Sequence, residues 1–251
     1  MAVEAPLVGR RALITGGASG IGRACAVRLA QDGAEIVVLD RDAEAAKTVA
    51  ADVGGTAMTV DLSDLAAVDT LDLAVDILVN NAGLQHVAPI HEFPVDRFSY
   101  ILRLMLEAPF RLARSALPHM YERGWGRVVN VSSVHGLRAS PYKSAYVTAK
   151  HGLEGLSKVI ALEGADQGVT SNCVNPAYVR TPLVEGQIAD QAKAHGLSEE
   201  QVVEEVMLAP AAIKRLIEPA EVADAVAWLC SPSAGSVTGA SLVMDGGWSA
   251  H

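Results

Sequence analysis

The chain has 251 residues, of which half are hydrophobic and only 4% are aromatic, and its formal net charge is −9. This acidic balance argues against a nucleic acid or an anionic membrane as partner, because either would require a basic face. Cys25, Cys173 and Cys230 have no disulfide or metal-ligand spacing, and no stretch stays apolar for the ~20 residues of a membrane helix. Since the start of the chain has no signal-peptide pattern, we expect reduced thiols and a cytoplasmic location.

Short β-branched runs alternate with longer Ala- and Leu-rich stretches, which is typical of a doubly wound, mainly parallel α/β sheet. We predict seven strands, near Arg11–Thr15, Glu35–Leu39, Thr56–Val60, Val75–Asn80, Gly126–Ser132, Val169–Val174 and Ser241–Met244. We predict helices that begin near Ile21, Ala43, Leu65, Val95, Ala145 and Ala220. Pro109 falls inside the helix after Val95 and predicts a kink there. No linker or repeat divides the sequence, so we expect one domain over residues 1–251.

The segment from Pro182 to Pro219 interrupts this alternation. It contains two helix-like pieces, Leu183–His195 and Ser198–Met207, inserted beyond the carboxyl end of a predicted strand. Open α/β sheets bind their ligands at that edge. We therefore expect a small helical lid at about residues 182–218, with a purely packing role as the alternative.

A glycine-rich turn, Thr15–Gly22 (TGGASGIG), joins the first predicted strand to the first helix. Its small residues let the backbone approach a pyrophosphate, and the helix amino terminus adds N–H groups and the positive end of a dipole. Asp40 closes the second strand, where a carboxylate binds the adenosine ribose hydroxyls and repels a 2′-phosphate. This predicts NAD as cofactor, although the adjacent Arg41 would suit NADP. Asp61 and Leu62 close the third strand, where the carboxylate reaches the adenine or, alternatively, caps the next helix.

Ser133 ends the fifth predicted strand, and Tyr146 and Lys150 follow at the i, i+4 spacing that puts two side chains on one helix face. A neighbouring ammonium and a positive nicotinamide both favour the phenolate, so we expect the pKa of Tyr146 to fall toward working pH. The tyrosine can then act as general acid/base on an alcohol or ketone, while the serine steadies the charge on the reacting oxygen. We predict these three residues as the catalytic residues of an oxidoreductase.

Five motifs follow one another in a familiar order: TGGASGIG (15–22), NNAG (80–83), Ser133, YVTAK (146–150) and NPAYVRTP (175–182). With them, the whole chain resembles the classical short-chain dehydrogenase/reductases. The resemblance implies a single Rossmann-type doubly wound domain with a seven-stranded sheet, NAD-dependent hydride transfer and usually a homotetramer. It also implies that the lysine holds the nicotinamide ribose and that the segment after the sixth strand contacts the cofactor. The residues expected to bind the cofactor are Gly16, Ser19, Gly20, Ile21, Asp40, Asp61, Leu62, Asn81, Ala82, Gly83, Tyr146, Lys150, Pro176, Val179 and Thr181.

Three positions depart from the family's pattern. Ala177 replaces the glycine of the usual NPG segment, and the stretch 61–80 is short, which predicts a trimmed third helix. Met105 occupies the place of the family's fourth catalytic residue, an asparagine that holds a proton-relaying water, and residues 99–111 contain no asparagine. Because a thioether offers no such hydrogen bond, the relay runs through backbone and water alone, or turnover is slower.

The loops around the expected site resemble more narrowly the branch of the family that interconverts D-3-hydroxybutyrate and acetoacetate. The likeness covers residues 80–94, 132–152 and 181–188 and the ending DGGW (245–248). By that resemblance, the residues that bind the substrate are Gln85, Ser133, His135, Lys143, Tyr146 and Gln187. One ammonium with several neutral donors suits a small keto acid, since its carboxylate must supply most of the orientation.

Several alternatives stay open at this stage. One alternative is an oxidoreductase for another small hydroxy or keto compound. Another is a reductase for a 3-oxoacyl thioester, although a lysine in the pocket argues against a thioester. A weakly catalytic NAD-binding regulator is favoured only by Met105, and nothing in the sequence requires a scaffolding role. The other histidines have no metal-ligand spacing, so we expect no metal site.

Overall fold

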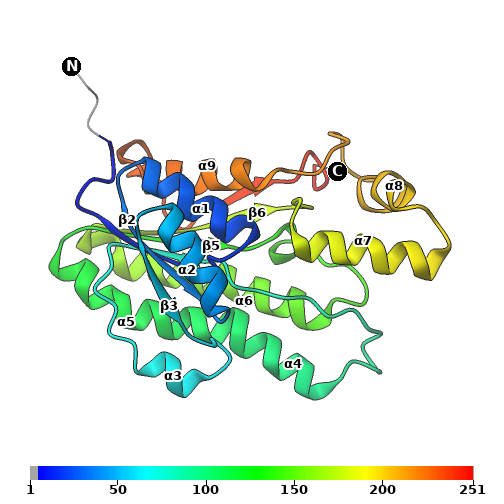
Figure 1. Cartoon of the computed structure of the whole chain (residues 1–251), viewed down its shortest axis with the longest axis horizontal. Coiled ribbons are helices and arrows are strands. Elements are labelled where there is room, and N and C mark those ends of the chain that lie inside the picture. Colours follow the sequence, from blue (N-terminus) through cyan, green and yellow to red (C-terminus); the bar gives the residue numbers. More distant parts are fainter. Residues whose placement is uncertain (1–4, 251) are drawn as a thin grey trace.

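The computed structural model describes residues 5–250 and shows a central sheet with helices on both faces (Figure 1). Within these residues the sheet has seven strands in the order β3-β2-β1-β4-β5-β6-β7, and all neighbouring strands are parallel. The strands are β1 (Arg11–Thr15), β2 (Glu35–Asp40), β3 (Thr56–Thr59), β4 (Ile77–Asn80), β5 (Gly126–Val131), β6 (Val169–Pro176) and β7 (Ser241–Met244). The predicted doubly wound sheet is confirmed.

Alternate side chains of each strand enter two separate cores, because successive residues of a strand point to opposite faces. Ala12 and Ile14 of β1 pack with the first helix layer, and Leu13 packs with the second. The first layer consists of α1 (Gly20–Gln31), α2 (Ala43–Asp52) and α9 (Pro219–Cys230), and the second of α3 (Leu65–Asp69), α5 (Ala108–Glu122) and α6 (Ser144–Gly164). In Figure 1, α1 and α9 lie above the sheet and α5 and α6 below it. The five-residue α3 confirms the trimmed third helix.

The strand order reverses between β1 and β4, which opens a crevice at their carboxyl ends. The Thr15 hydroxyl bridges the two strands there. It donates to the Val79 carbonyl (3.3 Å) and accepts from the backbone N–H groups of Asn81 (2.9 Å) and Ala82 (3.1 Å). The NNAG segment is therefore held against the end of β1, at the edge where the predicted site residues gather.

The helix predicted after Val95 is divided by a π-helical turn. α4 (Val95–Leu102) leads into η1 (Arg103–Glu107), and α5 follows directly. Pro109 lies in the first turn of α5, where its missing N–H breaks no bond of that helix. A π-helical turn thus lies just before the proline at which the sequence predicts a kink, and π turns of this kind are frequent at functional sites.

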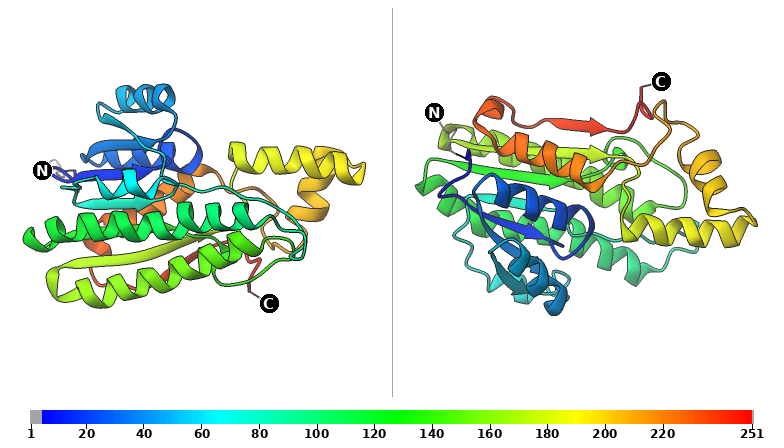
Figure 2. Two further views of the ribbon diagram at one scale, coloured as in Figure 1. Left: turned by 90° about the horizontal axis from the view of Figure 1, so that it is seen from below. Right: turned by 45° about the horizontal axis from the view of Figure 1, so that its top comes forward.

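The expected lid is helical, but its second piece differs from the prediction. α7 (Pro182–His195) is followed by α8 (Glu199–Gln201) and then by the π-helical η4 (Val202–Met207), not by one α-helix over 198–207. The i→i+5 bonding of a π-helix places Val202 and Met207, both buried, on one face, and they pack with Ile188. Figures 1 and 2 show α7 and α8 beyond the carboxyl ends of the strands.

One further difference between the predicted and the observed elements lies at the start of β4. β4 begins at Ile77 and not at Val75, because the Val75 N–H is used in a local bond to the Leu73 carbonyl. Three 3-10 turns complete the described elements: η2 (Val134–Gly136), η3 (Ala165–Gln167) and η5 (Pro232–Ala234). Among the described residues, no helix combines the length and the apolar character needed to cross a membrane. All three cysteines are buried and free.

Candidate active site

A groove runs along the carboxyl edge of the sheet from Asp40, at the end of β2, to Lys150 in α6. Two adjoining cavities form it, and both are bordered by Gly16, Ser19 and Gly83. Every residue that the sequence predicts to bind the cofactor borders one of these two cavities. The structure therefore brings the whole predicted set together in a single elongated groove.

The glycine-rich turn has the backbone shape that its glycines permit. Gly16 (φ +61°) and Gly20 (φ +51°) adopt the left-handed conformation that costs glycine little. A Cβ on Gly22 would lie 2.1 Å from the carbonyl oxygen of Gly16 and 2.6 Å from Nδ2 of Asn81. The Ser19 side chain makes no capping bond to α1, so the first-turn N–H groups are left for an anion such as a pyrophosphate.

Gly22→Ala tests this packing. The added Cβ would meet backbone, so we expect a loss of about 1–3 kcal/mol in the free energy of unfolding and weaker binding of NAD. The measurement is thermal unfolding together with an NAD titration. Gly155→Ala is the matched control, because Gly155 also lies in a helix and has nothing within 4 Å of its ideal Cβ. Equal effects of the two substitutions would contradict the close-packed turn.

At the β2 end of the groove, the Asp40 carboxylate ties the strand to the glycine-rich turn. Oδ2 accepts from the Ala18 N–H and Oδ1 from the Asp42 N–H, both at 3.1 Å. A carboxylate offers about four acceptor positions, so two remain for a ligand hydroxyl. Arg41 borders the same cavity.

Asp61 does not cap a helix. Its Oδ1 accepts from the backbone N–H (2.9 Å) and the hydroxyl (2.7 Å) of Ser63, and these bonds lower the pKa of the Asp61 carboxyl. α3 is capped by Asp64, which directly precedes its first residue and accepts from the N–H groups of the next turn. The capping alternative for Asp61 is therefore wrong, and Asp61 and Leu62 border the groove.

Ser133, Tyr146 and Lys150 converge at the other end of the groove. Ser133 follows the end of β5 by two residues, and Tyr146 and Lys150 lie in the first two turns of α6. The Lys150 ammonium donates to the Val131 carbonyl at 2.6 Å and lies 5.6 Å from the centre of the Tyr146 ring. This grouping is the one that their spacing in the sequence predicts.

Burial shifts the pKa values of both Lys150 and Tyr146 at this end of the groove. Burial lowers the pKa of Lys150 to about 8, while Cys173 and Glu154 act in the opposite direction. Burial raises the pKa of the Tyr146 phenol. A hydrogen bond with Ser133 lowers the pKa, but by less than burial raises it. The predicted fall of the tyrosine pKa depends on a bound, positively charged nicotinamide as well as on the ammonium, and it stays a prediction. In the protein alone, desolvation of the phenolate raises this pKa.

Met105 closes the side of the tyrosine that faces η1. It is only 1% exposed and lies in an apolar cluster with Ile101, Ala145 and Ala149, against which Tyr146 packs. A Cβ on Gly83 would lie 3.3 Å from the methyl carbon of Met105. At this position the wall of the groove is therefore apolar.

A cavity of about 50 Å³ adjoins the tyrosine, and the predicted substrate residues all border it. Two contacts draw their loops together. The Ala88 N–H donates to the carbonyl of Tyr142 (3.0 Å), which joins the loop of Gln85 to the turn of Lys143, and Gln187 of α7 donates to Gln85 (3.3 Å). Tyr142 has φ +68°, a conformation that is strained for a side chain of its size.

The cavity is suited to an anion. Burial lowers the pKa of Lys143, and no carboxylate among the described residues offsets this effect. Gln85 Nε2 is a buried donor that has no hydrogen-bond partner in the part of the chain that the structure describes. An ammonium and an amide donor are thus both short of acceptors, which a bound carboxylate would supply.

His135 borders the cavity as a neutral group. Burial, with help from Lys143 and His151, lowers its pKa to about 4. Its Nε2 lies 2.8 Å from the Ser140 hydroxyl and its Nδ1 3.5 Å from the Ser133 hydroxyl. Both ring nitrogens are thus directed at serines.

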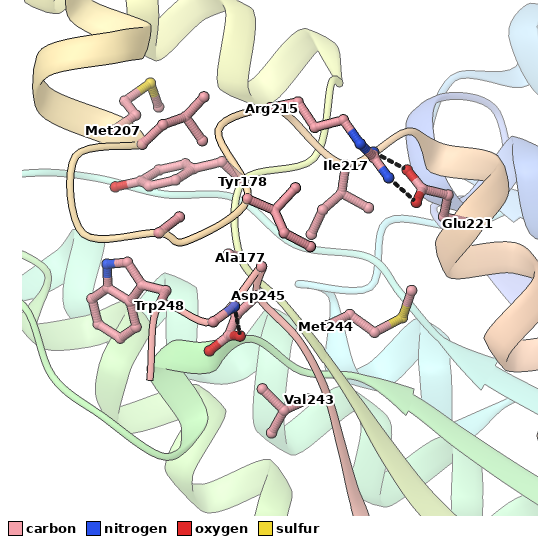
Figure 3. Close-up of a pocket in the computed structure, with 15 residues that line it drawn as sticks. Ala177, Tyr178, Met207, Arg215, Ile217, Glu221, Val243, Met244, Asp245 and Trp248 are labelled. Carbon is pink, nitrogen blue, oxygen red and sulfur yellow. Dashed lines mark hydrogen bonds and ion pairs between the residues drawn. The ribbon is translucent and has the colours of Figure 1, made fainter. Parts of the chain in front are cut away.

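Two aromatic residues of the cavity were missing from the prediction. Tyr178 and Trp248 line it together with the expected residues, and Figure 3 shows both beside a second hollow of about 350 Å³. The carbonyl of Gly246 accepts from the N–H groups of Ala212 and Ile213, both at 2.8 Å, so the C-terminal turn anchors the end of the lid segment. The sequence did contain a signal for Tyr178 and Trp248, because each is an aromatic residue inside a motif, NPAYVRTP and DGGW respectively, in a chain with few aromatics.

The chain is similar to known proteins over most of its length. A family model described as enoyl-(acyl carrier protein) reductase matches residues 16–249. The chain is 45% identical to D-beta-hydroxybutyrate dehydrogenase of Rhizobium meliloti, over 96% of this chain and 99% of that protein. It is 43% identical to D-beta-hydroxybutyrate dehydrogenase of Cupriavidus necator, over 98% and 100%. A structure from Agrobacterium tumefaciens with bound NADP, assigned as a 2-deoxy-D-gluconate 3-dehydrogenase, has a TM-score of 0.87 and 33% identity and covers 99% of both chains.

Proposed function

Because the chain belongs to the short-chain dehydrogenase/reductase family, we propose that it is an NAD-dependent dehydrogenase that interconverts D-3-hydroxybutyrate and acetoacetate. The observation that carries the proposal is the ammonium of Lys143, desolvated in a cavity of about 50 Å³ beside Tyr146 and offset by no carboxylate of the described chain. A small anionic substrate matches both the charge and the size.

The residues of the groove fit a dinucleotide. Because Gly22 has no Cβ, the glycine-rich turn can pack closely against the start of α1. The amino terminus of α1 borders the groove. When bound, NAD supplies the acceptor for the hydride that leaves the alcohol carbon. Asp40, with acceptor positions left for ribose hydroxyls, favours NAD over NADP.

The chain's own residues then divide the work. Lys143, Gln85 and Gln187 hold the substrate carboxylate, and His135 borders the same pocket. Tyr146 removes the hydroxyl proton as general base, or returns it in the reverse direction. The Lys150 ammonium, 5.6 Å from the centre of the Tyr146 ring, is close enough to favour the phenolate form of Tyr146. The Ser133 hydroxyl hydrogen-bonds the reacting oxygen.

Asp40→Ala tests the cofactor preference. Loss of the carboxylate removes both the ribose acceptor and the repulsion of a 2′-phosphate, so the ratio of kcat/KM for NAD over NADP should fall about tenfold or more. Asp40→Asn should lower the same ratio while keeping an acceptor for the Ala18 N–H. An unchanged ratio in both variants would show that Asp40 does not select the cofactor.

The substrate class is tested with two compounds that share a carbon skeleton, 3-hydroxybutyrate and its methyl ester. A charge-assisted bond to Lys143 is worth about 1.5–3 kcal/mol, so kcat/KM should be about 10- to 100-fold higher for the acid. A preference for the ester, or for a cyclic or polyhydroxy alcohol, would move the proposal to another dehydrogenase of the family. A cytoplasmic location and a homotetramer remain predictions from the sequence.

A further inference from the structure

The candidate active site has a buried carboxylate beneath it. Glu154 is 4% exposed and lies one helical turn after Lys150 on the inward face of α6. Its Oε1 accepts from Nδ2 of Asn175 at 2.5 Å, and its Oε2 accepts from the Ser241 hydroxyl at 2.7 Å. Since both oxygens accept hydrogen bonds, the group is arranged as an ionised carboxylate.

Two connections lead from this carboxylate to the catalytic residues. The same Nδ2 of Asn175 also donates to the main-chain carbonyl of Ser133 at 2.9 Å. Lys150 precedes Glu154 by four residues, which places the two side chains on the same face of α6, and the charge of Glu154 acts to raise the pKa of Lys150. Packing around the carboxylate is close, because a Cβ on Gly136 would lie 2.9 Å from Oε1.

We propose that Glu154 is a positioning residue for the dehydrogenase reaction, fixing the main chain of Ser133 through Asn175 and supplying the negative charge that balances the buried Lys150 ammonium. The inference rests on the proposed alcohol oxidation at Tyr146. It holds for whichever alcohol is oxidised there, because neither Glu154 nor Asn175 nor Ser241 borders the substrate cavity.

The groups that surround the Lys150 ammonium determine how readily it loses its proton. From β5 it meets the Val131 carbonyl, from β6 the Cys173 thiol, and from α6 itself the Tyr146 ring and Glu154. Burial raises the pKa of the Cys173 thiol, which keeps the thiol neutral. Glu154 is therefore the charged group that opposes desolvation of the ammonium, and an ammonium that loses its proton can no longer stabilise the tyrosine phenolate.

Glu154→Gln tests the charge, because it keeps the shape of the side chain and removes the charge together with one acceptor oxygen, an effect for which Ser241→Ala is the control. The readout is the pH profile of kcat for alcohol oxidation, whose alkaline limb reports the loss of the Lys150 proton. Without the carboxylate this proton is lost more easily, so the limb should move to lower pH by about one unit or more. Glu154→Asp, which keeps the charge, should restore most of the limb.

Two further variants separate the charge from the hydrogen bonds. Ser241→Ala removes one donor to Glu154 and leaves the charge, so its alkaline limb should stay in place. Asn175→Ala releases the Ser133 carbonyl, so kcat should fall with little change in the KM for the alcohol or in the Kd for NAD. An unchanged limb in Glu154→Gln, whatever its melting temperature, would overturn the proposal.

The test also has a readout that needs no turnover. The loss of the Lys150 proton itself, followed by the 13C chemical shift of the lysine Cε carbons and assigned by its absence from Lys150→Arg, should occur at lower pH in Glu154→Gln than in the parent. If the wild-type protein fails to oxidise 3-hydroxybutyrate, the proposed substrate is wrong, but this titration still tests the role of Glu154. An identical titration in both proteins would sink the role of Glu154.

Discussion

Tyr146→Phe should lower kcat for the oxidation of 3-hydroxybutyrate by about 10³-fold while the Kd for NAD changes by less than about threefold. The substitution removes a single oxygen, the one that by our proposal exchanges a proton with the substrate. The phenyl ring that remains still packs on Ile101, Met105, Ala145 and Ala149, so the fold should not be disturbed. Steady-state kinetics and an NAD titration on the same preparation measure both quantities.

Tyr121→Phe is the control for this experiment. Tyr121 lies near the end of α5 and packs with the second core, so removing its hydroxyl should leave kcat unchanged. A Tyr146→Phe variant that keeps more than about a tenth of the wild-type kcat would show that another group supplies the proton.

Lys143→Ala should raise the KM for 3-hydroxybutyrate about 10- to 100-fold with a small effect on the KM for NAD. The ammonium is the one full positive charge among the predicted substrate residues, and the amides of Gln85 and Gln187 are neutral donors. A neutral secondary alcohol of similar size should show no such increase, since it has no carboxylate to lose. An equal increase for the neutral alcohol would mean that Lys143 shapes the pocket and does not bind the carboxylate.

The same residue predicts a pH dependence. Because burial lowers the pKa of Lys143, the ammonium that binds the carboxylate is present below this pKa and lost as the pH rises through it. The KM for 3-hydroxybutyrate should therefore increase on the alkaline side in the wild-type protein and stay flat there in Lys143→Ala. Lys158→Ala, an equal change of charge on the exposed face of α6, should behave like the wild type.

Much of the fold follows from the sequence because the local signals agree with one another. Seven apolar runs, each followed by a helix or a turn, predicted every strand of the described sheet to within two residues at each end. Apolar periodicity cannot reveal where a helix changes its hydrogen-bonding pattern, and so the π-helical segments at 103–107 and 202–207 were missed. They depend on packing, as at Val202 and Met207, which must both be buried.

The candidate site shows the same division. Ser133, Tyr146 and Lys150 were predictable because motif spacing fixes which side chains meet at a strand end and on one helix face. Glu154 was not, since a glutamate in a helix is usually solvated, and only the packing of β6 and β7 against α6 buries it. The rise of the Tyr146 pKa in the protein alone could not be predicted, because the sequence indicates which charges are near but not how far the group is desolvated.

The most direct test of the central claim is the increase of NADH absorbance when the protein is mixed with NAD and, separately, with D- or L-3-hydroxybutyrate. Rapid reduction of NAD with the D form and little with the L form would support the reaction, the cofactor and the carboxylate pocket together. Tight binding of NAD without reduction by either form, or equal rates with both, would contradict the proposed function.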